Sequence, residues 1–181
     1  VSHDGLPRDD AIAFAIDQSL YYGSGNHGFG SAQSNLFYKY DIITEQWSEI
    51  AAFPGVRRQY ARGSVIGGKG YLYGGIDFDG IPQKDIWEYD PSTDSWKELL
   101  EFPGAARWQA ASFVINEELY YGTGRDLSLF YHDFWKYNPK NDSWTKLADL
   151  PKLQCYETIS MSIYDQGYLG LGRDCTGVYL N

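Results

Sequence analysis

The sequence contains little of what most metal and redox sites are built from. Two cysteines and three histidines occur in 181 residues, and neither residue type falls into a metal-ligand spacing. Phosphate-binding glycine loops and hydrolase nucleophile motifs are absent too. We therefore expect neither a metal ion nor a cofactor, and no motif marks a catalytic residue.

Long apolar runs and a positive charge balance are also missing. No uninterrupted apolar stretch reaches the roughly 20 residues that a membrane-spanning helix needs, and no cleavable signal opens the sequence. Acidic residues outnumber basic ones by 24 to 15, which gives a formal net charge of −9. This balance argues against nucleic acid or anionic lipid as a general partner. No window shows helical periodicity, so we expect no α-helix.

What the sequence does have is aromatic residues that recur. Tyrosine occurs 16 times and tryptophan 6 times. Trp47, Trp96 and Trp144 each end a similar segment, which begins with an aromatic residue, any residue, a tyrosine, and an aspartate or asparagine. The three tryptophans lie 49 and 48 residues apart. Each is followed by a hydrophobic residue and proline at the same interval. Self-similarity at this period indicates one supersecondary unit that stacks on its neighbours.

Each copy contains the same order of short runs. In the second copy, residues 63–66 form an apolar run, residues 67–70 a turn, and residues 71–73 a second run that ends at two glycines. A third run covers residues 86–91 after a variable loop, and a fourth passes through Trp96. Short β-rich runs separated by turn residues predict four antiparallel strands per copy and an all-β fold.

A four-stranded sheet repeated at about 50 residues is typical of a β-propeller blade. Residues 71–75 resemble the aromatic and diglycine strand of the kelch repeat, and residues 85–91 with Trp96 resemble its second half. The chain is thus identified as a member of the kelch-repeat β-propeller family, closest in style to kelch proteins of bacterial envelopes. The resemblance implies a propeller of four-stranded antiparallel blades, about three and a half of them present. The expected blades cover residues 8–53, 58–102, 107–150 and, for the partial fourth, 155–181.

The fourth copy stops before its third strand, because Asn181 stands in the register of Lys84 and His132. Such a half blade would expose unpaired edges and an apolar face. Three explanations are open: a stretch of a ring of six or seven blades, a four-bladed ring closed by residues 1–6, or a half ring completed by another chain. We favour the first.

Binding in a propeller is expected at the end where the loops between blades and the loops between second and third strands surround the channel. The register places Arg8, Arg58, Arg107 and Cys155 at one equivalent position, 50, 49 and 48 residues apart. Three cations at one level predict a positive mouth, suited to carboxylates, sugars or acidic peptide side chains. The alternative is that a repeated arginine bonds backbone carbonyls between blades. The candidate ligand-binding residues are Arg8, Arg58, Arg107, Arg125, Arg173, Trp108, Tyr60, Phe78 and His27.

Two further features accompany this face. Asp77, Asp126 and Asp174 recur at the start of the variable loop and are interpreted as turn-forming residues. Cys155 and Cys175 both lie in the fourth copy, in loops that open on the same face. A disulfide between them and two free thiols are both compatible with the spacing. A disulfide would fit an oxidising compartment, and we expect the protein to lie outside the cytoplasm.

The resemblance admits two enzymatic relatives, copper-radical oxidases and sugar-acid mutarotases or epimerases. A copper site fails because His3, His27 and His132 stand in unrelated registers. A mutarotase needs an acid/base pair beside a carboxylate-binding arginine, for which Arg107 with Glu157 or Asp126 could serve.

We predict a non-catalytic module that binds a protein or a glycan, or acts as a scaffold, within a larger envelope protein. A sugar-acid mutarotase or epimerase is the alternative. A third hypothesis is a structural subunit that docks through the open edge of its fourth blade.

Overall fold

The structure is a computed structural model, and it describes residues 8–27, 31–151, 156–173 and 178. Within these residues the chain forms strands, turns and short irregular segments, and no helix is present. The prediction of an all-β fold is confirmed. None of the described segments forms a helix with the length and apolarity needed to cross a bilayer.

Seventeen strands are present in the described part of the chain. In chain order they are β1 (Arg8–Asp9), β2 (Ile12–Ile16), β3 (Ser19–Gly23), β4 (Asn26–His27), β5 (Ser31–Gln33), β6 (Phe37–Asp41), β7 (Gln46–Ile50), β8 (Arg62–Ile66), β9 (Lys69–Tyr73), β10 (Ile86–Asp90), β11 (Ser95–Glu98), β12 (Ala111–Ile115), β13 (Glu118–Gly122), β14 (Phe134–Asn138), β15 (Ser143–Lys146), β16 (Ile159–Ile163) and β17 (Gln166–Gly170).

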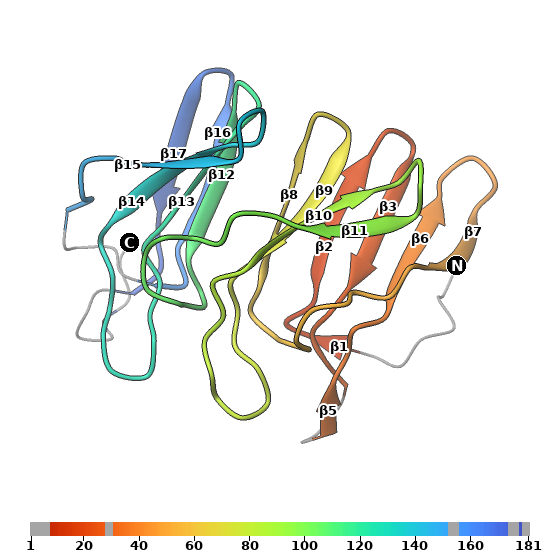
Figure 1. The fold of residues 1–181 in the computed structure, drawn as a ribbon, viewed down its shortest axis with the longest axis horizontal. Helices are drawn as coiled ribbons and strands as arrows, with labels where there is room; N and C mark the ends of the chain where they lie inside the picture. The colour runs from red at the N-terminus through yellow and green to blue at the C-terminus, as the bar shows by residue number, and fades with distance from the viewer. Residues whose placement is uncertain (1–7, 28–30, 152–155, 174–177, 179–181) are drawn as a thin grey trace.

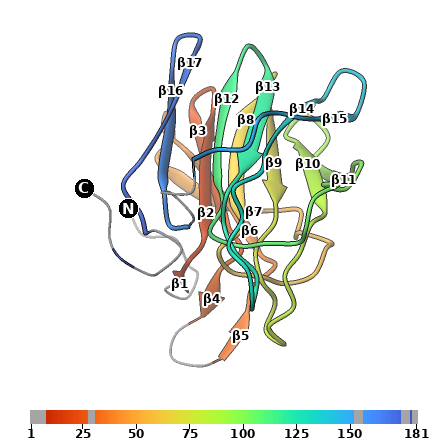
Figure 2. The same cartoon turned by 90° about the vertical axis from the view of Figure 1, so that its left-hand side faces the viewer.

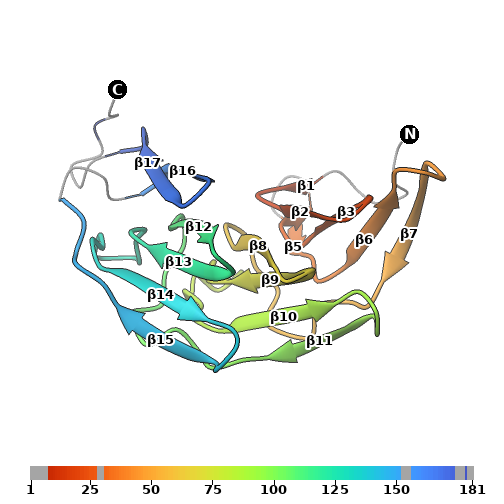
Figure 3. The ribbon, with the colours of Figure 1, turned by 90° about the horizontal axis from the view of Figure 1, so that it is seen from above.

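The strands pair into four successive sheets, which we call blades 1 to 4. Blade 1 has the order β2-β3-β6-β7, blade 2 β8-β9-β10-β11 and blade 3 β12-β13-β14-β15, whereas blade 4 consists of β16 and β17. Every neighbouring pair is antiparallel. Figure 3 shows the blades side by side along an arc, with the first strand of each blade on the inside and β7, β11 and β15 at the periphery.

The two ends of the blades differ in their connections (Figure 1). One end, called the loop end below, carries the segments 24–27, 31–36, 74–85 and 123–133, which lie between second and third strands, and the segments 51–61 and 99–110, which join blades. The opposite end, called the turn end, carries the short turns within each blade. A small additional sheet, β1-β4-β5, lies at the loop end of blade 1 (Figure 2).

Blades pack by fitting a large side chain of one blade against a glycine of the next. Residues of β2 alternate strictly between buried and exposed, so that Phe14 faces blade 2. A Cβ placed on Gly70 would lie 2.4 Å from the Phe14 ring, and one on Gly167 would lie 2.2 Å from the ring of Phe113. These contacts leave no room for a side chain at either glycine.

The repeated tryptophans tie each blade to the segment that leaves the preceding one. The Trp96 indole N–H donates to the carbonyl of Ala51 at 2.9 Å, and the Asp94 carboxylate accepts the Ala51 backbone N–H. Trp144 and Asp142 repeat this arrangement one blade later on the backbone of Leu100. The period seen in the sequence therefore reflects a repeated connection between blades.

Blade 4 presents an apolar face along β16. Its side chains Ile159, Met161 and Ile163 stand in the register of Ile12, Phe14 and Ile16 and are about half exposed, at 52%, 50% and 49%. Docking of another chain on this edge stays a prediction. Residues 1–6, considered above as a means of closing a four-bladed ring, lie outside the described residues.

Candidate functional site

Two of the predicted ligand-binding arginines are buried inside their own blades. Arg58 and Arg107 each have an exposed fraction of 0%. The Arg58 guanidinium donates to the carbonyl of Gly74 at 3.1 Å and forms a two-pronged ion pair with Asp85. Its Nε donates to the carbonyl of Val56 at 2.8 Å. The prediction that this arginine contacts a ligand is wrong, because its donors are already used and no solvent reaches it.

Arg107 has the same surroundings one blade later. It donates to the carbonyl of Thr123 at 2.9 Å and to both oxygens of Asp133 at 2.6 and 3.0 Å. Its guanidinium also lies over the rings of Phe102 and Tyr131, 4.8 and 4.2 Å from their centroids. The prediction of ligand contact is therefore wrong for Arg107 as well. The alternative is correct in that both arginines bond backbone carbonyls, but wrong in that these bonds lie within one blade and not between blades.

The partner carboxylates remain ionised in spite of their surroundings. Burial disfavours the charged forms of Asp85 and Asp133, but the bonds from Arg58 and Arg107 outweigh it, so the pKa of each carboxyl lies below its usual value. A neighbouring tryptophan indole, 2.8 Å from the carboxylate, adds a donor in both blades. Each arginine and aspartate thus form a structural unit of the blade.

Arg8 is the exception among the three repeated arginines. It donates to the carbonyl of Leu36 at 2.8 Å, and Leu36 occupies the position at which blades 2 and 3 have aspartate. Within the described residues its buried Nε and Nη2 have no hydrogen-bond partner. Its guanidinium lies between the rings of Tyr22 and Tyr38, 5.7 and 5.3 Å from their centroids. Burial lowers the pKa of Arg8.

The residues that surround the inner mouth stand two positions after the repeated arginines. Asp10, Tyr60, Gln109 and Glu157 all have left-handed backbone angles, with φ of 52°, 56°, 55° and 55°. They line a cavity of about 380 Å³ together with Arg62. These four residues share the 50, 49 and 48 residue spacing, which is the pattern that could have identified them.

This mouth carries charges of both signs, Asp10 and Glu157 beside Arg62 and Arg173, which corrects the prediction of a positive one. Glu157 accepts a bond from Gln109 at 2.9 Å and pairs with Arg173 at 3.0 Å. Burial raises the pKa of Asp10, although a hydrogen bond with Tyr60 opposes the shift. The predicted residues Tyr60 and Arg173 therefore lie at the mouth, but Arg173 is engaged by a carboxylate.

Two more of the predicted residues, Arg125 and Trp108, are brought together between blades 3 and 4. The Arg125 guanidinium lies 5.2 Å from the ring centroids of both Trp108 and Phe130 and 5.5 Å from that of Tyr156. Phe130 stacks on Tyr156 with centroids 4.9 Å apart. Trp108 and Arg125 thus form a cation–π contact inside the junction, and aromatic rings fill this junction.

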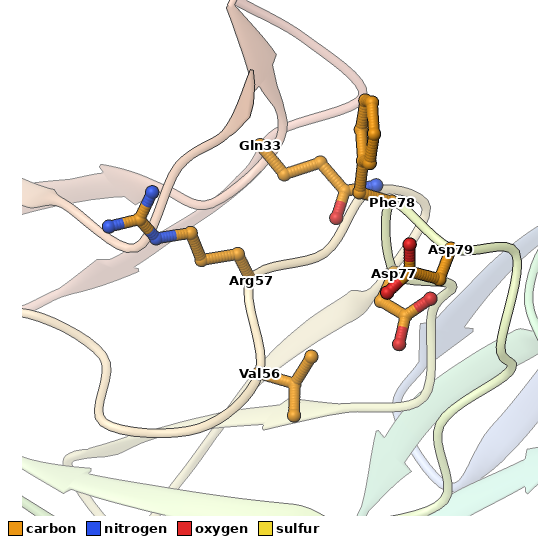
Figure 4. A pocket seen from close by; sticks show the side chains of 6 residues that line it. All are labelled: Gln33, Val56, Arg57, Asp77, Phe78 and Asp79. Atoms are coloured by element: carbon orange, nitrogen blue, oxygen red, sulfur yellow. The ribbon is translucent and has the colours of Figure 1, made fainter. Parts of the chain in front are cut away.

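The junction between blades 1 and 2 is open instead. A cleft of about 400 Å³ lies there, lined by Gln33, Val56, Arg57, Asp77, Phe78 and Asp79. Figure 4 shows the Gln33 side chain reaching toward the turn that carries Asp77, Phe78 and Asp79, while the Arg57 guanidinium points away from both aspartates. The predicted residue Phe78 belongs to this cleft and is 70% exposed. His27 lies in β4, and burial followed by the charges of Arg8 and Arg57 lowers its pKa.

The interpretation of the repeated aspartates as turn-forming residues is confirmed where they are described. Asp77 accepts the backbone N–H of Ile81 at 2.8 Å, and Asp126 accepts those of Ser128 and Leu129 at 2.7 and 2.6 Å. Asp174, Cys155 and Cys175 lie outside the described residues, so the disulfide stays a prediction.

Large apolar side chains project from the loop end, a feature that the sequence analysis recognised only at Phe78. Two lie on each of the two fully described loops between second and third strands. They are Phe78 and Ile81, exposed by 70% and 57%, and Leu127 and Leu129, exposed by 69% and 59%.

A catalytic arrangement is not assembled from the residues considered for a mutarotase. Arg107 is sealed inside blade 3, Asp126 is held in its turn, and Glu157 faces the mouth with Arg173. Among the described residues no three histidine, cysteine or acidic side chains are grouped so that they could hold a metal ion.

Comparison with known proteins identifies the family. The family described as "KLHDC2/KLHL20/DRC7 Kelch-repeats domain" matches residues 3–162. No curated protein matches the chain. A solved structure titled "Structure of YjhT" is similar with a TM-score of 0.82 and 20% identity, over 96% of this chain and 60% of that one. This likeness shows the fold alone, and the chain spans 60% of the length of that structure. Together with the stacked antiparallel blades, the match over residues 3–162 shows that this chain belongs to the kelch-repeat family of β-propellers, of which it forms about three and a half blades.

Proposed function

We propose that this protein binds another protein through its loop end. The observation that carries the proposal is the set of exposed apolar side chains on the loops of blades 2 and 3, Phe78, Ile81, Leu127 and Leu129. Apolar side chains that gather on one face and are surrounded by charged groups are typical of protein interaction sites. Kelch-repeat domains generally bind proteins, which supports the same conclusion.

The energetics favour a protein over a glycan as the partner. Complete burial of a large apolar side chain contributes about 1.5–3 kcal/mol, and four such side chains can form the centre of an interface. A glycan is usually held by dense polar groups beside an accessible ring. At the junction between blades 3 and 4 the rings of Trp108, Phe130 and Tyr156 are already covered by Arg125 and by one another, so that Phe78 is the one strongly exposed ring on the described loops of this end.

The rest of the loop end supplies specificity. The mouth offers the carboxylate of Asp10, and the cleft between blades 1 and 2 offers those of Asp77 and Asp79. With a net charge of −9, the surface suits a partner that combines apolar and basic side chains, because complementary charge raises both selectivity and association rate. We place this module outside the cytoplasm, as the resemblance to envelope kelch proteins implies.

Selection of a random peptide library on the immobilised protein tests the proposal. Enriched peptides are then measured against the double variants Phe78→Ser/Ile81→Ser and Leu127→Ser/Leu129→Ser. The matched control is Ile42→Ser/Ile43→Ser, which removes two exposed apolar side chains, 54% and 69% exposed, from the turn end. We expect each loop variant to weaken binding by at least tenfold, on the order of 1.4 kcal/mol, and the control to leave it unchanged.

Two results would contradict the proposal. One is equal binding of the selected peptides to the loop variants and to the wild type. The other is binding confined to sugars on a glycan array, which would transfer the role to the polar groups of the mouth.

A further inference from the structure

The cleft between blades 1 and 2 contains a buried hydrogen-bond acceptor to which no described residue donates. Gln33 is 4% exposed, and its Nε2 donates to the carbonyl of Ile76 in blade 2 at 3.2 Å. Its Oε1 has no hydrogen-bond partner among the described residues. Reversing the amide would set the oxygen against the Ile76 carbonyl, so the neighbouring group fixes which atom is the acceptor. Such an atom is costly to leave unpaired, and a ligand that supplies a donor would remove the cost.

The other described junctions do not contain this feature. By register, Pro82 in blade 2 and Phe130 in blade 3 stand where Gln33 stands in blade 1. Phe130 stacks on Tyr156 and closes its junction. A polar residue at the first junction therefore coincides with an open cleft of about 400 Å³.

The walls of the cleft are rich in acceptors and carry one exposed ring. Asp77 and Asp79 both line it, and within the described residues Asp79 forms no ion pair. Phe78 stands between them in the sequence, and its ring face is available to a cation. Arg57 contributes its aliphatic stem to the lining, because its guanidinium is directed away from the aspartates (Figure 4).

We infer that this cleft binds a cationic side chain, lysine or arginine, of the partner protein. The inference rests on the proposed function. The bound ammonium or guanidinium group would donate to Gln33 Oε1 and to the Asp79 carboxylate, with its aliphatic stem against Val56 and the Phe78 ring. An acidic side chain would face two carboxylates and an unpaired acceptor, so the cleft discriminates by charge.

Nuclear magnetic resonance titration with small probes tests the inference without a partner protein. The probe is N-acetyl-lysine methylamide, and N-acetyl-norleucine methylamide provides the same stem without the charge. We expect the lysine probe to shift the side-chain amide of Gln33 and the backbone amides of residues 76–79, and the norleucine probe to leave them in place. Raising the salt concentration should weaken binding of the lysine probe, because salt screens its attraction to the carboxylates.

Two variants localise the effect, and a third is the control for the loss of charge in one of them. Asp79→Asn acts at an exposed turn and removes one charge, and Gln33→Met keeps the length of the side chain but removes the acceptor. Each should lower the affinity for the lysine probe roughly three- to tenfold, because hydrogen bonds from a charged donor are stronger than bonds between neutral groups. Glu45→Gln removes an exposed charge at the turn end and should have no effect.

Each remaining outcome overturns either the inference or the function beneath it. Equal shifts with the norleucine probe, stronger shifts with an N-acetyl-glutamate probe, or shifts at Asp10 and Glu157 instead of the cleft would refute the cationic assignment. Lysine binding in the cleft combined with failure of the peptide selection would leave this site standing and would refute the proposed function of the loop end.

Discussion

Replacing Asp133 by asparagine tests whether the buried arginines stabilise the blades in which they lie. The substitution keeps the shape of the side chain and one acceptor, but it removes the charge that compensates a guanidinium with no exposure. Removing one partner of a buried ion pair costs about 3–5 kcal/mol. Since Asp133 is 19% exposed, water offsets part of this loss, and we expect about 3 kcal/mol, at the lower limit of that range.

Urea unfolding followed by tryptophan fluorescence, together with calorimetry at pH 7, measures this loss. For a chain of this size a loss of 3 kcal/mol corresponds to a decrease in Tm of about 6–12 °C. Glu98→Gln, which removes one exposed charge from β11, is the control and should change the free energy of unfolding by less than about 0.5 kcal/mol.

The pH dependence of the difference gives a second, independent test. The folded state lowers the pKa of Asp133, so the folded state binds its proton less readily than the unfolded state. The stabilisation is therefore present above the unfolded pKa of about 3.9 and is lost as the pH falls through the lower, folded value. The wild type and the variant should converge in stability over this acidic window. A loss below about 1 kcal/mol at pH 7, the range of a surface pair, would refute the reasoning, as would a difference that persists at the acidic limit.

Three further predictions concern other contacts. Leu36→Asp should give Arg8 the carboxylate that Asp85 and Asp133 provide in blades 2 and 3, and should stabilise the protein by about 1 kcal/mol over Leu36→Asn in urea unfolding. Equal stability of the two would show that Arg8 needs no counter-charge. Gly70→Ala should cost about 1–3 kcal/mol, because its Cβ would enter the Phe14 ring; Phe14→Leu should recover part of the loss, and full additivity in the double variant would contradict the fit. Burial and a bond to a carboxylate raise the pKa of Tyr131 to about 12, so absorbance titration should show a phenol that ionises well above the ordinary value near 10. Because the unfolded state ionises first, the free energy of unfolding should fall as the pH rises above about 10. A normal titration would contradict the contact.

The fold could be predicted from the sequence because the contacts that hold it together repeat. Trp96 and Trp144 bond the backbone of the preceding blade in the same way, so selection for the contact leaves a period that is visible in one sequence. The all-β prediction and the four successive copies follow from that period. The apolar alternation of β2 and the turn glycines add the strand order within each copy.

The candidate site could not be predicted equally well, because two positions carry the same period. The positions of Arg58 and Tyr60 recur with identical spacing in every blade, and spacing alone does not tell which side chain faces the channel. The backbone decides it: Tyr60 has φ of 56°, and this left-handed turn directs it to the mouth while Arg58 enters the blade. The partner of Arg58 lies 27 residues away at Asp85, too far for a local pattern to connect them.

The contrast between repeated and non-repeated residues indicates where this protein should bind a partner. Arg58 and Trp96 recur in blade 3 as Arg107 and Trp144, and each pair contacts equivalent backbone groups in its two blades. A residue that breaks the repeat has no such obligation. Gln33 stands where the next blades have proline and phenylalanine, and it leaves an acceptor unpaired in an open cleft. Phe78 rises from a loop whose length and composition vary between blades. Repeated residues therefore mark the contacts within and between blades, and residues that depart from the repeat mark the surface that is available to a partner.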